Sequence, residues 1–234
     1  MTSLTTIGFD ADDTLWQNEH FYRLTMARFA GLLGEYATPE AIARTLLESE
    51  KRNLAFYGYG IKGFTLSMIE TAIEVTEGRA PASVIAEILN AGREMLRHPV
   101  ETLPHVRATL DALAGAYRLV LITKGDLFDQ ERKVAESGLG ELFAAVEIVS
   151  DKTAATYARV FADYGDGPER AMMVGNSMKS DVLPAIAAGS WGVHVPHALN
   201  WELEHAEAPI DAPRFRRLDH LGELVALVEG LSGG

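Results

Sequence analysis

The segment TTIGFDADDTLW, residues 5–16, decides how this chain folds. Its β-favouring and apolar residues from 5 to 10 predict a strand, and three carboxylates follow at the end of that strand, Asp10, Asp12 and Asp13. The carboxyl edge of an open α/β sheet is where ligands bind. Because residues two apart on an extended chain face the same way, we expect Asp10 and Asp12 to address one ligand, while Asp13 points elsewhere and caps the next helix.

Paired carboxylates need a positive partner. Two acidic groups side by side repel each other unless a cation or a shared proton lies between them. A hard divalent cation with oxygen ligands meets that need, and magnesium suits a site that combines few carboxylates with a substrate phosphate. The alternative is that the acidic turn only caps the following helix. We therefore expect Asp10 and Asp12 to take part in a magnesium site.

Beyond this segment, β-rich stretches alternate with helical ones. Strands are predicted at residues 118–123, 145–149, 171–174 and 192–195. Helices are predicted at roughly 104–114, 127–137, 153–163 and 181–188. Three of these helices end at a glycine that suits a left-handed cap: Gly115, Gly138 and Gly189. The alternation predicts right-handed crossovers and an α/β fold with a Rossmann-like parallel sheet and helices on both faces.

The interval from 16 to 98 does not follow this alternation, because it contains several helical stretches and no convincing strand. We expect a smaller all-helical cap domain at 16–98, inserted into an α/β hydrolase core made of 1–15 and 99–234. Thr38, which precedes a proline, marks the start of one cap helix. Pro81 marks the start of another.

The stretch YGYGIKGF, residues 57–64, lies between cap helices and contains three glycines. It predicts a turn or mobile loop whose backbone could approach a ligand closely. We expect Tyr59 and Lys62 to bind the part of the substrate remote from the reaction, since they could contact a ring or a second anionic group. The alternative is an ordinary connector whose aromatic residues pack inside the cap.

The composition excludes several classes of protein and site. A formal charge of −12 over 234 residues would repel a nucleic acid polymer, which is bound through many lysine and arginine contacts. The chain has no cysteine, so disulfides, thiolate metal ligands and a cysteine nucleophile are excluded. The scattered histidines do not support a zinc site. With no signal-peptide pattern and no membrane-spanning run, we expect a cytoplasmic protein that acts on a small molecule; a homodimer is left open.

Four short motifs in order suggest a family. They stand at these positions: Asp10, Asp12 and Thr14; Thr123; Lys152; and the loop VGNSMKSD at 174–181. With them the chain resembles the haloacid dehalogenase superfamily, whose phosphatases carry Asp-x-Asp-x-Thr after the first core strand. Any one of these motifs alone would be weak, but the four together on predicted strand ends are a strong signal. The helical insertion occupies the position of a cap in that superfamily.

The resemblance implies a role for each matched residue. Asp10 would be the nucleophile that attacks a phosphate monoester, and Asp12 would be the general acid and base. Thr123 offers a hydroxyl to a phosphate oxygen, and Lys152 neutralises charge shared by the phosphate and Asp10. Asp181 would be a metal ligand. The implied activity is a magnesium-dependent phosphatase that hydrolyses a small phosphorylated metabolite.

Two departures from the common family pattern affect this expectation. Asn176 stands where many members have aspartate, so we expect it to hold the ion weakly or through water. Lys124 and Gly125 follow Thr123 where an Asn-Gly pair is frequent. We expect both to lie on the substrate-binding side of the site, with the contact to the leaving group left open.

Other activities remain as alternatives. A haloacid dehalogenase also uses an aspartate nucleophile, but that branch would have no acid/base aspartate two residues later, so Asp12 favours a phosphatase. A phosphonate-cleaving enzyme or a phosphomutase would share much of the core. From another class, a phosphoacceptor signalling module resembles a chain of about half this length with the acceptor on a later strand. An inactive binding protein is the last alternative.

Overall fold

The computed structural model describes residues 3–232, and within them six parallel strands form one sheet in the order β3-β2-β1-β4-β5-β6. The strands are β1 (Thr6–Phe9), β2 (Arg118–Lys124), β3 (Ala145–Val149), β4 (Ala171–Gly175), β5 (Trp191–His194) and β6 (Phe215–Arg217). The predicted α/β fold and its five strands are confirmed, each to within a residue or two. The short sixth strand was not predicted.

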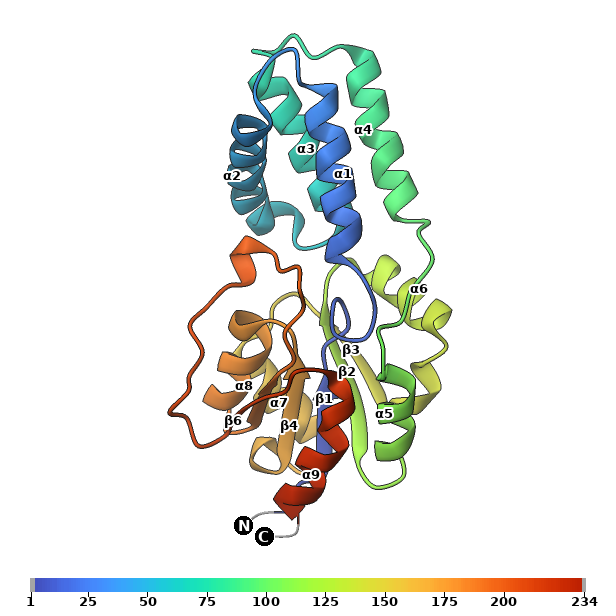
Figure 1. Ribbon diagram of the computed structural model, residues 1–234, viewed down its shortest axis with the longest axis vertical. Coiled ribbons are helices and arrows are strands. Elements are labelled where there is room, and N and C mark those ends of the chain that lie inside the picture. Colours follow the sequence, from blue (N-terminus) through green and yellow to red (C-terminus); the bar gives the residue numbers. More distant parts are fainter. Residues whose placement is uncertain (1–2, 233–234) are drawn as a thin grey trace. The chain divides into compact units, whose positions relative to one another are not determined.

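Helices follow the strands as the alternation requires (Figure 1). The main ones are α5 (Val106–Leu113), α6 (Leu127–Ser137), α7 (Ala154–Asp163), α8 (Leu183–Ala187) and α9 (Leu224–Ser232). Short 3₁₀ helices are η1 (Gly140–Leu142), η2 (Pro168–Arg170), η4 (Glu202–Glu204) and η5 (Leu221–Glu223), and η3 (Met178–Val182) is a π-helical turn. Gly138 and Gly189 adopt the predicted positive φ angles of 65° and 99°, whereas Gly115 does not have a positive φ.

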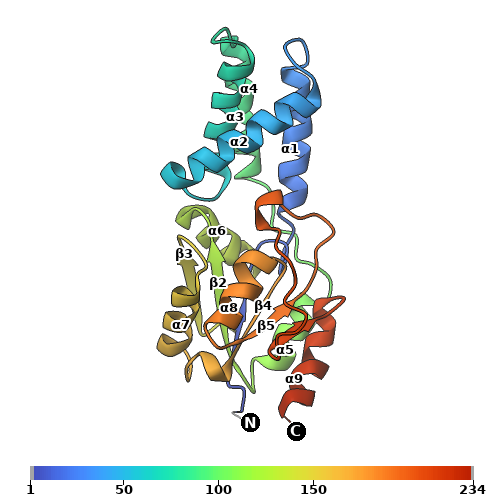
Figure 2. The ribbon, with the colours of Figure 1, turned by 90° about the vertical axis from the view of Figure 1, so that its left-hand side faces the viewer.

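The helices cover both faces of the sheet because alternate strand residues point to opposite sides. On β2, Leu119 and Leu121 pack in a core with α5 and α9, while Val120 and Ile122 pack in a second core with α7. Figures 1 and 2 show these helices on the two sides of the strands. β1 lies between β2 and β4 and is covered on both faces, so it is buried along its whole length.

A helical cap is inserted after β1 and contains α1 (Glu19–Leu32), α2 (Pro39–Tyr57), α3 (Ile61–Val75) and α4 (Ala82–Met95). It has its own apolar core, which includes Leu33, Leu46, Phe64, Met68 and Ile88. By its internal contacts the compact helical unit comprises His20–Pro99 together with Gly125–Gln130, a segment that sequence analysis assigned to the α/β core. None of the helices in the described residues has the length and apolar character needed to cross a membrane.

The cap helices begin where the sequence predicts, but the glycine-rich stretch is shorter than expected. The hydroxyl of Thr38 accepts a hydrogen bond of 3.3 Å from the amide of Ala41 and so caps α2. Tyr57 ends α2, and α3 already begins at Ile61, so only residues 58–60 form the connection. The expected loop over 57–64 is therefore wrong in its extent, because helical hydrogen bonding resumes as soon as Gly58 and Gly60 have turned the chain.

Candidate active site

The candidate site is built where the central strands end. β1 lies between β2 and β4, with Phe9 in register with Leu121 and with Val174. The amide of Asp10 donates to the carbonyl of Val174 at 2.9 Å, which fixes the chain just past β1. Because carboxyl ends of parallel strands meet at one edge, Thr123 at the end of β2 reaches this same edge.

The Asp10 carboxylate is buried and both its oxygens are held by hydrogen bonds. The Thr14 hydroxyl donates to Oδ2 at 2.9 Å, and the Lys152 ammonium donates to Oδ1 at 2.5 Å. Burial and the nearby charge of Asp181 raise the pKa of Asp10 to about 7, against the opposing effect of Lys152. Burial is the main cause of this shift, and the charge of Asp181 adds to it.

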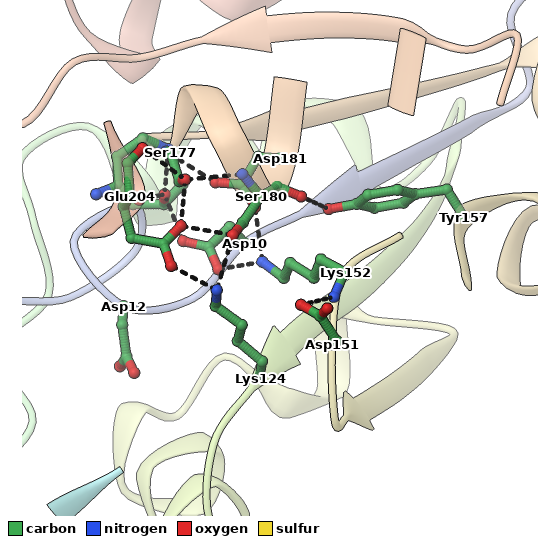
Figure 3. Close-up of polar contacts among 12 residues, drawn as sticks. Asp10, Asp12, Lys124, Asp151, Lys152, Tyr157, Ser177, Ser180, Asp181 and Glu204 are labelled. Atoms are coloured by element: carbon green, nitrogen blue, oxygen red, sulfur yellow. Dashed lines mark hydrogen bonds and ion pairs between the residues drawn. The ribbon is translucent and has the colours of Figure 1, made fainter. Parts of the chain in front are cut away.

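Lys152 bridges Asp10 and a second carboxylate (Figure 3). Its ammonium donates to Asp181 Oδ1 at 2.7 Å, and its side chain is only 1% exposed. Burial alone would lower the pKa of Lys152, but the charges of Asp10 and Asp181 raise it above its ordinary value. The lysine is thus held as a cation between two aspartates.

Asp181 lies on the π-helical turn η3, directly after β4. Its Oδ2 accepts a hydrogen bond of 2.9 Å from the amide of Ser177, so the residue also caps the start of that turn. Gly175 at the end of β4 makes this approach possible, since a Cβ there would collide with the Asp181 carboxylate. The Tyr157 hydroxyl donates to the carbonyl of Ser180 at 2.9 Å and supports the turn from α7.

The side chain of Asp12 does not join Asp10, contrary to the geometric expectation. It accepts hydrogen bonds from Trp16 Nε1 at 2.7 Å and from the Lys133 ammonium at 2.8 Å and 3.1 Å. Figure 3 shows it apart from the carboxylate cluster. The rule that residues two apart face the same way holds only within a strand, and β1 ends at Phe9. From Ala11 the chain turns, because its carbonyl accepts the amides that follow.

Asp13 has the capping role that its position predicts. Its carboxylate accepts the amides of Asn18 and Glu19 at 2.9–3.1 Å, at the start of α1. It does so with a positive φ of 61°. Burial raises its pKa to about 7 although these hydrogen bonds favour the ionised form. Nδ1 of His197 lies 3.6 Å from Asp13 Oδ1.

Asn176 and Thr14 complete the oxygen-rich edge. The Thr14 hydroxyl accepts a hydrogen bond of 3.0 Å from the backbone amide of Asn176 and donates one of 3.3 Å to Asn176 Oδ1. Thr14 therefore links Asn176 to Asp10, and Lys152 links Asp10 to Asp181. No cluster of three histidine or acidic side chains suited to a metal occurs in the described part of the chain. Two carboxylates and one amide oxygen do fit magnesium, which keeps several waters and needs few protein ligands.

Lys124 lies beside this cluster and is paired with a residue that sequence analysis did not select. Its ammonium donates to Glu204 Oε1 at 2.5 Å and to the Ser180 hydroxyl at 2.7 Å. Glu204 belongs to η4, in the irregular segment between β5 and β6. Its other oxygen accepts from the hydroxyls of Ser177 and Ser180, each at 2.5 Å. Glu204, like Lys133, carries no motif, and only its position in space reveals it.

The residues proposed for substrate recognition in the cap lie within the helical unit. Lys62 is on α3, and its ammonium donates to both carboxylate oxygens of Asp126 at 2.9 Å. It also lies 5.9 Å from the ring centre of Phe128. Tyr59 is in the short connection between α2 and α3. Gly125, which opens the segment 125–130 of this unit, has a φ of 149°.

A family model and two similar proteins point to the same family. Residues 4–189 match the family model of haloacid dehalogenase-like hydrolases. The chain is similar to a haloacid dehalogenase-like family hydrolase from Xanthomonas campestris, with 44% identity, a TM-score of 0.87 and coverage of 99% and 94% of the two chains. It is 29% identical over 218 residues to a glyceraldehyde 3-phosphate phosphatase from Methanothermobacter thermautotrophicus, covering 87% of this chain and 89% of that protein.

A more distant structure shares the fold. It is a HAD-family hydrolase from Bacillus subtilis, solved bound to magnesium. It is 14% identical, with a TM-score of 0.67 and coverage of 97% of this chain and 99% of that chain.

Proposed function

The chain belongs to the haloacid dehalogenase-like hydrolases, and on that premise we propose that it is a magnesium-dependent phosphatase for a small phosphate monoester. The observation that carries the proposal is the Asp10 carboxylate, buried at the carboxyl edge of the sheet and held by Thr14 and Lys152. The similarity to a glyceraldehyde 3-phosphate phosphatase supports phosphate esters as the substrate class.

In the proposed reaction Asp10 attacks phosphorus and forms an aspartyl-phosphate, which water then hydrolyses. Thr14 and Lys152 hold the nucleophile in one orientation, so that attack needs no rearrangement of the carboxylate. Lys152 also offsets the charge that phosphate brings beside Asp10. Thr123 donates its hydroxyl to a phosphate oxygen.

The proposed metal ion is magnesium, held by Asp10, Asp181 and Asn176. When bound, it supplies the positive charge that lets a dianionic phosphate approach these carboxylates. The pairing of the two aspartates supports this reading, since the carboxylates of Asp10 and Asp181 share one lysine ammonium. The related fold from Bacillus subtilis was solved with magnesium, which is consistent with the choice of ion.

Asp12 is proposed as the general acid that protonates the leaving oxygen and then as the base that deprotonates water. Its carboxylate is engaged by Trp16 and Lys133, so it must rotate from these partners to reach a substrate. The sequence of a dehalogenase would place no such aspartate here, and Asp12 therefore favours phosphate esters. A magnesium-bound Asp12 side chain would need the same rotation.

Substrate specificity is proposed to come from Lys124 and Gly125 in the segment after β2, and from Tyr59 and Lys62 in the cap. The other core residues handle the phosphoryl group alone, so discrimination depends on groups that reach the rest of the molecule. Lys62→Ala should change kcat/KM for the preferred ester and leave a small aryl phosphate nearly unaffected. Equal changes for both substrates would make Lys62 a structural partner of Asp126 only.

The direct test is phosphate release from p-nitrophenyl phosphate by wild type and Asp10→Asn. The amide is nearly isosteric but is a poor nucleophile, so turnover should be abolished while the thermal unfolding midpoint shows a folded protein. Asp111→Asn, an exposed aspartate on α5, is the matched control and should keep wild-type turnover. Persistent hydrolysis in Asp10→Asn would refute the assignment. Chloride release from 2-chloropropionate without phosphate ester hydrolysis would instead indicate a dehalogenase.

A further inference from the structure

Glu204 connects three parts of the α/β unit that are distant in sequence. Lys124 ends β2, the hydroxyls of Ser177 and Ser180 lie at the start of η3, and Glu204 comes from the segment after β5. The carboxylate accepts three short hydrogen bonds from these groups, each of 2.5 Å. Nothing in the motifs of the chain predicts this arrangement.

The pair of Lys124 and Glu204 is largely removed from water, with side-chain exposures of 13% and 11%. Burial raises the pKa of Glu204, but Lys124 and the serine hydroxyls outweigh it and hold that pKa below its ordinary value. Buried ion pairs contribute little net stability, because desolvation offsets most of their attraction. Such pairs have a clearer effect on the positions of the side chains, since each charge restricts where the other can lie.

Lys124 lies close enough to the candidate site for the position of its ammonium to matter there. Lys124 directly follows Thr123, and Figure 3 shows its ammonium pointing into the cluster that contains Asp10. A lysine ammonium on its flexible stem pairs with whichever carboxylate is in reach. Lys152 already bridges Asp10 and Asp181. A second ammonium on those oxygens would occupy positions that a metal ion needs.

We propose that Glu204 is a positioning residue that holds the Lys124 ammonium away from the carboxylates of Asp10 and Asp181. By this role Glu204 prevents a second ammonium from joining Lys152 on those oxygens, whose remaining lone pairs can then bind a divalent cation. The inference rests on the proposed function in that it assumes a magnesium site at these two aspartates. The position of Lys124, however, can be tested without magnesium or substrate.

The variant Glu204→Gln keeps the size of the side chain and removes its charge. We expect crystal structures of wild type and Glu204→Gln to show that the Lys124 ammonium moves from residue 204 to Asp10 or Asp181. Magnesium affinity, measured by calorimetry without substrate, should fall by about tenfold or more, since unit charges a few ångströms apart interact strongly at an effective protein dielectric of about 20. Glu202→Gln, an exposed change in the same short helix, should leave both observations unchanged.

The double variant Lys124→Met/Glu204→Gln separates positioning from a merely structural role. It leaves no unpaired charge, so it should fold and bind magnesium as tightly as wild type even if Glu204→Gln alone is unstable. Weak binding in the folded double variant, or a Lys124 ammonium that stays on Ser180 in Glu204→Gln, would overturn the inference. A wild type that neither binds magnesium nor hydrolyses phosphate esters would refute the proposed function instead, and the crystal structures would still decide the position of Lys124.

Discussion

Lys152→Met tests how far the site depends on one buried cation. The Lys152 side chain is 1% exposed and lies 2.5 Å and 2.7 Å from oxygens of Asp10 and Asp181. Methionine has similar length and fills the same space, but it leaves two carboxylates facing each other in the interior. The change therefore removes the charge with little loss of packing.

The expected loss of stability is large. Removing one partner of a buried ion pair costs about 3–5 kcal/mol, because the remaining charge is uncompensated. Solvent does not weaken these two ion pairs appreciably, since both contacts are buried. A native protein is stable by about 5–15 kcal/mol, and each kcal/mol shifts the melting temperature of a chain of this size by about 2–4 °C. Lys152→Met should therefore melt about 6–20 °C below wild type in a chelator.

Tryptophan fluorescence is the appropriate probe. The three tryptophans, Trp16, Trp191 and Trp201, all belong to the α/β unit, so their signal reports unfolding of the part that contains the site. Added magnesium should reduce the deficit of Lys152→Met, because an ion that binds only the folded state stabilises it and replaces some of the lost charge. Lys51→Met, an exposed lysine on α2, should have little effect.

Two results would refute this reasoning. A melting temperature of Lys152→Met equal to that of Lys51→Met would mean that the two aspartates do not need the lysine. A double variant Lys152→Met/Asp181→Asn should recover part of the lost stability, because it removes one of the two facing charges. If it is less stable than Lys152→Met, repulsion between Asp10 and Asp181 is not the cause of the loss.

Three further predictions concern the acid, the metal and pH. Asp12→Asn should slow hydrolysis of esters with poor leaving groups by about 10²–10⁴-fold in steady-state assays, and an unchanged rate would remove Asp12 from general acid–base catalysis. Chelation should abolish turnover and magnesium restore it; Asp181→Ala should raise the magnesium concentration for half-activity more than Asn176→Ala does, and the reverse order would mean that their roles are misassigned. The pKa of Glu204 lies below its ordinary value in the folded protein. Its pair with Lys124 should therefore stabilise the fold fully above the ordinary glutamate pKa and lose this effect as pH falls through the lowered pKa. Melting temperatures of wild type and Glu204→Gln should thus converge in acid, and a constant difference would contradict the prediction.

The amino-acid sequence determined the fold class. Apolar runs of strand length that alternate with helical segments can bury both faces only in a parallel sheet with helices on each side. β6 escaped prediction because its three residues, Phe215–Arg217, carry two arginines and form a strand through pairing with β5. The connection between α2 and α3 was overestimated because glycine signals a turn without indicating how soon the helix resumes.

The sequence also singled out three residues that the fold brings together. Asp10, Lys152 and Asp181 follow different strands of one parallel sheet, whose carboxyl ends share an edge, and the structure brings the three side chains together. The tertiary structure alone decided the partners of Asp12 and Glu204. The Asp12 carboxylate accepts a hydrogen bond from Lys133, and the Glu204 carboxylate accepts one from Lys124. Each lysine comes from a segment distant in sequence. Strands and helices can be predicted from the local periodicity of apolar residues. The partner of a charged residue in a turn depends instead on which distant segments the completed fold places beside it.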